Sequence, residues 1–134
     1  MGARGSRHEL EKVVFGFVII LAMTLNFGFV MGEFDNPDQH YVLELFAAVV
    51  VNLIATVLKF GERTQIGTIH LAASLVADLQ LIAAASVWAV AVHVTGTGLT
   101  PPVMANIVSL AAGALMANVL SVIILIIETV LCHR

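Results

Sequence analysis

Residues 66–94 read IGTIHLAASLVADLQLIAAASVWAVAVHV, and this stretch decides the fold class. Its one formal charge is that of Asp78. A bilayer core about 30 Å thick needs roughly 20 apolar residues in helical form, so the stretch is long enough to cross a membrane. A soluble helix of this length would carry polar residues along one whole face. The stretch therefore predicts a transmembrane helix.

The rest of the chain has the same character. Hydrophobic residues make up 60% of the 134 residues and charged residues 11%, whereas typical soluble domains have about 45–50% and about 25%. Four segments are long and apolar enough to cross a bilayer, namely about 12–32, 41–60, 66–94 and 103–131. The sequence predicts an all-α, polytopic membrane protein in which residues 1–134 form a single domain, a bundle of four transmembrane helices.

The basic residues indicate the orientation of this bundle. All six Lys and Arg residues fall on one side of the predicted membrane: Arg4, Arg7, Lys12, Lys59, Arg63 and Arg134. Cytoplasmic loops carry the excess of Lys and Arg in membrane proteins. We expect both termini to be cytoplasmic, the membrane to be an inner or plasma membrane, and the lipid bilayer to be the surrounding partner.

Polar side chains interrupt the apolar segments at similar depths. Thr24, Asp78 and Asn118 each lie about twelve residues, or roughly 18 Å of helix, from the cytoplasmic ends. On the second segment Glu44, Ala48, Asn52 and Thr56 share one helical line, with a spacing of four residues. The predicted polar group near mid-membrane consists of Asp78, Asn52, Asn118, Thr24, Ser74 and Ser121.

Asp78 is the central residue of this group. A carboxylate at the bilayer centre costs roughly 2.5–3.5 kcal/mol on insertion scales, so it requires compensation. Residues 64–133 contain no Lys or Arg that would pair with it. Two interpretations remain open, a neutral or hydrogen-bonded carboxyl group that locks the helix packing, or a carboxylate that binds a mobile cation or proton. His70, on the same helix face, either relays protons to Asp78 or anchors the helix at the interface.

The first loop is acidic and lies on the predicted external side. Glu33, Asp35 and Asp38 would attract cations to that face. The alternative is a loop kept polar only to maintain the topology.

Small residues mark the expected contact faces of the helices, because they let helix backbones approach closely in lipid. One set of helix-packing positions is Gly28 and Gly32, and a stripe in the fourth segment adds Ala105, Ser109, Gly113 and Ala117, ending at Ser121. The stripe packs either within one bundle or against further copies of the chain, and we expect a homo-oligomer.

Several functions and ligands are not expected. The net charge is −3 and no basic cluster follows the N-terminal segment, so nucleic acid is not an expected partner. Cys132 is the single cysteine, no nucleophile or metal-ligand motif is present, and we expect neither an enzyme nor a cofactor nor a metal site. His40 and His93 lie at the predicted external ends of two segments and are interpreted as interfacial anchors.

The stretch Thr95-Gly96-Thr97-Gly98, followed by a prolyl turn and a long helix containing Gly113, resembles the filter and inner helix of tetrameric potassium-type channels. This resemblance implies a re-entrant loop in which residues 86–94 form a pore helix and the Thr-Gly carbonyl groups line the filter.

From these observations we expect a small oligomeric membrane protein that conducts or transports a small cation or proton through the polar group centred on Asp78. The alternative is a non-transporting accessory or scaffold subunit of a larger membrane complex.

Overall fold

The computed structural model describes residues 3–32, 36, 42–60 and 65–132. The helices are α1 (Ala3–Val30), α2 (Val42–Lys59), α3 (Gln65–Ala89) and α4 (Pro101–Cys132), and a π-helical turn, η2 (Val90–Val94), extends α3. No strand occurs in these described ranges. The predicted all-α fold with four membrane-spanning segments is confirmed.

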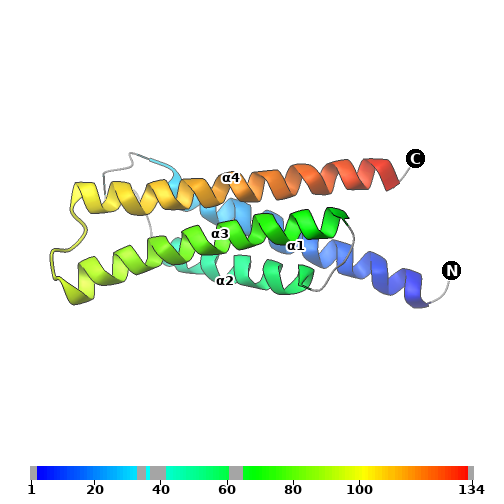
Figure 1. Ribbon diagram of the computed structural model, residues 1–134, viewed down its shortest axis with the longest axis horizontal. Helices are drawn as coiled ribbons and strands as arrows, with labels where there is room; N and C mark the ends of the chain where they lie inside the picture. The colour runs from blue at the N-terminus through cyan, green and yellow to red at the C-terminus, as the bar shows by residue number, and fades with distance from the viewer. Residues whose placement is uncertain (1–2, 33–35, 37–41, 61–64, 133–134) are drawn as a thin grey trace.

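The four helices form an antiparallel bundle (Figure 1). Each helix packs mainly against two neighbours, in the ring α1–α2–α3–α4. The start of α1 and the end of α4 lie at the same end of the bundle, here named the termini end (Figure 1). The other end, where α1 ends and α4 begins, is named the distal end.

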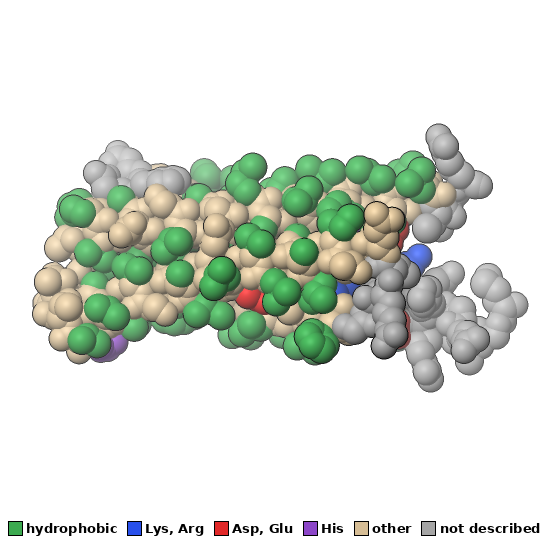
Figure 2. Space-filling view, in the orientation of Figure 1, with side chains coloured by type: hydrophobic (Ala, Val, Ile, Leu, Met, Phe, Trp, Pro, Cys, Tyr) green, Lys and Arg blue, Asp and Glu red, His purple; other side chains and the backbone are tan. Residues whose placement is uncertain are grey.

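The outside of the bundle is apolar along its length. All four helices are long and apolar enough to cross a membrane: Leu10–Val30, Val42–Lys59, Gln65–Val94 and Pro101–Leu131. In Figure 2 hydrophobic side chains are spread over the whole visible face, and charged side chains gather near the termini end, apart from an acidic patch near mid-length. This is the surface that a bilayer solvates, so the chain is a multi-pass membrane protein.

The connection between α3 and α4 does not contain a re-entrant loop. Residues 86–94 continue α3 without a break, first as α-helix and then as η2. Gly96 and Gly98 have φ values of 70° and 76° and make the reversal, since glycine adopts positive φ without strain. The Thr100 hydroxyl then accepts a hydrogen bond from the Val103 N–H (3.4 Å) at the start of α4. The pore helix and filter that the resemblance to potassium-type channels implies at residues 86–99 are therefore not formed.

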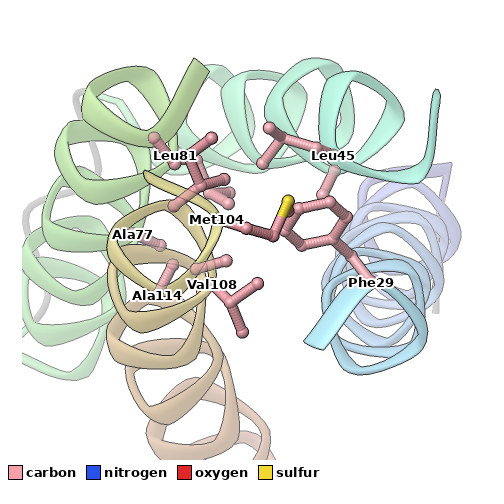
Figure 3. Packing of buried hydrophobic residues seen from close by; sticks show 11 residues of the cluster. Phe29, Leu45, Ala77, Leu81, Met104, Val108 and Ala114 are labelled. Carbon is pink, nitrogen blue, oxygen red and sulfur yellow. The ribbon is translucent and has the colours of Figure 1, made fainter. Parts of the chain in front are cut away.

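Large apolar residues fill the interior near the distal end. We name this cluster the distal core, and its members include Phe29, Leu45, Leu81, Met104, Ile107 and Val108. Figure 3 shows that all four helices contribute to it. A smaller cluster of Phe15, Ile19 and Ala55 lies in the half of the bundle nearer the termini.

Two of the predicted packing glycines lie at close helix contacts. A Cβ atom on Gly113 of α4 would lie 2.8 Å from Cδ of Gln80 in α3, and one on Gly28 of α1 would overlap the Glu44 carboxylate of α2. Gly32 instead follows the end of α1, is exposed and has φ 107°. It ends the helix, so its prediction as a packing residue is wrong.

Candidate functional site

The interior changes from apolar to polar part-way along three of the four helices. On α2 the buried residues Leu45 and Ala48 are followed by Asn52 and Thr56 toward the termini end. On α4 the apolar run that ends at Ala114 is followed by Asn118 and Ser121, and on α3 the polar residues precede Leu81. We name these side chains the polar group: Asn52, Thr56, His70, Ser74, Asp78, Asn118 and Ser121.

Asp78 joins α3 to α2 through a hydrogen bond. Its side chain is buried, with 6% exposure, and Oδ2 accepts a hydrogen bond from the Thr56 hydroxyl. The same hydroxyl lies 3.0 Å from the Asn52 carbonyl oxygen. A hydroxyl group has one proton to donate and can also accept. It therefore donates to an ionised Asp78, or accepts from a protonated Asp78 while donating to the Asn52 carbonyl, so the site suits both protonation states.

Much of the hydrogen-bonding capacity of the polar group is unused. The Asn52 side-chain N–H donates to the Ala48 carbonyl oxygen (2.9 Å), but its amide oxygen is not hydrogen-bonded to any described residue. The same holds for Asp78 Oδ1, Ser74 Oγ, Ser121 Oγ and both polar atoms of the Asn118 side chain. Each buried polar atom without a partner costs about 1–3 kcal/mol. The polar group can therefore gain hydrogen bonds or ligand contacts from water, a proton or a cation.

Helix α1 presents a mostly apolar wall to this region. Phe15 packs edge-on against His70, with ring centroids 5.1 Å apart. The Lys59 ammonium lies over the Phe15 ring, 4.4 Å from its centroid, as a cation–π contact. This basic group at the end of α2 thus contacts an aromatic ring of α1. One polar side chain of α1, Asn26, is fully buried, and its amide atoms have no hydrogen-bond partner within the described part of the chain.

A family model matches residues 39–129, and its description is a family of unknown function, DUF6394. The chain belongs to this family. The matched range contains α2, α3, most of α4 and every residue of the polar group, whereas it leaves α1 out. No curated protein and no solved structure matches the chain. Membership in DUF6394 therefore places the polar group within the family region and assigns it no activity.

The structure buries five of the six residues predicted for the polar group. These five are Asp78, Asn52, Asn118, Ser74 and Ser121. Thr24 is exposed, and its hydroxyl donates to the Leu21 carbonyl oxygen (2.9 Å) within its own helix. The prediction that Thr24 belongs to the group is wrong, because its depth is suitable but its helix face points outward.

Three buried polar residues were not among the predicted site residues. Thr56 follows Asn52 by four residues on the same face of α2, so helical spacing alone indicates its inward position. His70 is fully buried rather than at the lipid interface. Asn26 lies on the same face of α1 as the buried residues Phe15, Ile19 and Ala22, but the opposite face is equally apolar, so the sequence held no signal for its inward position.

The other predicted site residues lie elsewhere. Glu33, Asp35, Asp38 and His40 fall outside the described residues. His93 is exposed at the distal end, and its ring packs edge-on against Trp88 at 5.3 Å between centroids. Within the described ranges no three His, Cys, Asp or Glu side chains are grouped closely enough to hold a metal ion. The remaining packing stripe on α4 is half-buried at Ala105, Gly113 and Ala117 and exposed at Ser109.

Proposed function

We propose that the protein moves a small cation or a proton across the membrane through the polar group centred on Asp78. The supporting observation is the Asp78 carboxyl group, which is buried, contacts the Thr56 hydroxyl and has Oδ1 unpartnered among the described residues, in a bundle where α2, α3 and α4 each bury neutral polar side chains. Oxygen ligands of this kind replace the hydration shell of a hard cation. A site with one ionisable group and several neutral ligands also lets the ion leave again, which transport requires.

The contact between Asp78 and Thr56 supports the exchange step. An arriving cation or proton neutralises the carboxylate, and the Thr56 hydroxyl turns from Asp78 to the Asn52 carbonyl oxygen at 3.0 Å. When the cation leaves, the hydroxyl turns back. Loading and unloading then need only a hydroxyl rotation at this position, rather than a rearrangement of the helices.

We also propose that the termini end faces the cytoplasm of an inner or plasma membrane. The Lys and Arg residues in the described ranges, Arg4, Arg7, Lys12 and Lys59, lie toward the termini end, which is the pattern of cytoplasmic ends. The acidic residues Glu33, Asp35 and Asp38 then lie in the loop on the external side, where they raise the local concentration of cations.

The experiment is flux in proteoliposomes that contain the purified protein and a dye sensitive to H⁺, Na⁺ or K⁺. Asp78→Ala is expected to abolish flux and leave assembly intact. Asp78→Asn keeps the shape and hydrogen bonding but removes the titratable proton, so it separates proton chemistry from hydrogen bonding. Thr24→Val is the matched control, because Thr24 is exposed at a similar depth. Flux that persists in Asp78→Ala would refute the proposal.

A second candidate is a non-transporting accessory or scaffold subunit of a larger membrane complex, in which a different chain covers the exposed Ser109 of α4. Ser109 is exposed, and Ala105 and Ala117 on either side of it are only half-buried, so this small-residue face leaves room for another helix. We propose a second copy of the chain as the occupant, which gives a homo-oligomer. The mass of the particle in mild detergent tests this. A symmetric assembly supports the transport function, and a monomer or a mixed complex without Asp78-dependent flux supports the accessory role.

A further inference from the structure

Helix α2 carries polar side chains farther toward the distal end than Asp78. On α3 the inward residues distal to Asp78 are Leu81 and Ala84, both fully buried. On α4 the apolar run from Met104 to Ala114 fills the same half of the bundle. On α2, in contrast, a line with a spacing of four residues starts at the distal end with the half-buried Glu44 and continues through the buried residues Ala48, Asn52 and Thr56. Three of these four positions are polar.

Glu44 lies between α2 and α1, where α1 has a glycine. The Glu44 side chain is half-buried, and a Cβ atom on Gly28 would overlap its Oε2 and lie 3.3 Å from its Cδ. Any side chain at position 28 would displace the carboxylate. Gly28 thus makes the space that holds a carboxylate against the α1 backbone, at a depth where the buried side chains of α3 and α4 are apolar.

Glu44 and Asn52 are separated by little more than two turns of α2. These residues are eight positions apart, about 12 Å of helix, and the side chain between them on this face is the methyl group of Ala48. Ala48 is fully buried in the distal core. Figure 3 shows the Met104 side chain pointing toward the Phe29 ring, with Leu45 beside them. These flexible or small side chains close the interior at this level in the conformation described.

We propose that Glu44 is a second cation-binding group, at the distal end of a path that follows the inward face of α2 to Asp78. This inference rests on the proposed transport function and extends it. A cation leaving Asp78 passes the Asn52 amide oxygen and then Ala48, where movement of Met104 opens the distal core. It next meets the Glu44 carboxylate before it reaches water. The occupant of both sites is a small cation or proton, since the polar groups on the path are carboxylate, amide and hydroxyl oxygens.

The test is sided flux in proteoliposomes, with Na⁺, K⁺ or H⁺ varied only on the distal side. Glu44→Gln is expected to raise the concentration for half-maximal flux at that side about five-fold or more, the factor that one unit charge about 4 Å away gives even in water. Gly28→Ala is expected to give a shift in the same direction by displacing the carboxylate. Ala48→Leu is expected to lower the maximal flux, because the larger side chain blocks the proposed path between Asp78 and Glu44.

Glu128→Gln is the matched control, since Glu128 is a half-buried carboxylate of α4 near the termini end. It is expected to leave the distal half-saturation unchanged. Flux that depends on Asp78 but is unaffected by Glu44→Gln and Ala48→Leu would overturn the path along α2 and leave the proposed function standing. A wild-type protein without Asp78-dependent flux would overturn both. Helix content and elution of each variant in detergent exclude misfolding as the cause of a loss.

Discussion

The two halves of the bundle interior are built from different side chains. In the distal half, Phe29, Leu81 and Met104 are each fully buried among other apolar residues. In the half nearer the termini, Asp78, Asn118 and the other members of the polar group occupy the equivalent interior positions. The two halves belong to the same four helices, so the difference lies in the side chains and not in the backbone.

We infer from this difference that the distal core holds the bundle together, and that the polar group carries the proposed transport function. In lipid, apolar side chains gain little from leaving the solvent, and helices associate through close packing and hydrogen bonds. The distal core supplies close packing by large side chains. The polar group has many unsatisfied atoms and contributes less packing. We therefore expect substitutions in the distal half to change stability most, and substitutions in the polar group to change transport most.

The largest expected change in stability is that of Phe29→Ala. Phe29 is fully buried in the distal core, and its truncation is expected to cost about 2–3 kcal/mol in the free energy of unfolding, the cost of the cavity of roughly 100 Å³ that it leaves. Phe27→Ala is the matched control, because Phe27 of the same helix is 53% exposed. It is expected to change the unfolding free energy by about 0.5 kcal/mol or less. Unfolding by SDS in mixed micelles measures both values, and equal losses would mean that the distal core does not hold the bundle.

A smaller change is expected for Thr56→Val, which keeps the shape and removes the hydroxyl. It leaves Asp78 Oδ2 without its donor, at an expected cost of about 1–2 kcal/mol, the range of interhelical hydrogen bonds in membranes. Flux is expected to fall, because the hydroxyl that accompanies loading is lost. Thr24→Val, whose hydroxyl bonds only within its own helix, is the control for both readouts. If the two variants behave alike, the contact between Thr56 and Asp78 has no role.

The smallest change in stability is expected for Asn118→Leu, a replacement of nearly the same shape. Asn118 has 1% exposure, and its polar atoms have no hydrogen-bond partner among the described residues. Replacing an unsatisfied amide by an apolar group of the same shape is neutral or stabilising, by roughly 0–1 kcal/mol. Flux is nevertheless expected to fall, since an oxygen ligand is lost. A strongly destabilised Asn118→Leu protein would show that the amide has a structural partner, and would refute the comparison.

The sequence predicts the fold of this chain well, because the long uncharged runs exclude other folds. The ends of α2 and α3 with η2 lie within about two residues of the predicted segments. Helix α1 begins at Ala3, earlier than the predicted residue 12, because a charged segment continues the helix beyond the apolar run. The π-helical turn at Val90–Val94 was not foreseen, since no sequence signal distinguishes it from the α-helix before it.

On α1 the buried polar residue was predictable in depth but not in direction. Thr24 and Asn26 are two residues apart, so their side chains point about 200° apart around α1. In a soluble helix the apolar face would show which of them is buried. In α1 the lipid-facing residues Phe17 and Phe27 are as apolar as the buried Phe15 and Phe29, and this contrast is absent. Only the packing of the four helices shows that Asn26 points inward.

The most direct test of the central claim is the reactivity of Asp78 toward dicyclohexylcarbodiimide, an apolar reagent that modifies protonated carboxyl groups within membranes. Mass spectrometry of the labelled peptides follows Asp78 and, in the same sample, Glu128 as an internal reference. If a mobile cation or proton reaches Asp78, its labelling rises as the pH falls and is slowed by the transported cation, while labelling of Glu128 is unaffected by that cation. If Asp78 is labelled at one rate under all conditions, or never, no mobile ion exchanges at this carboxyl group and the transport function is wrong.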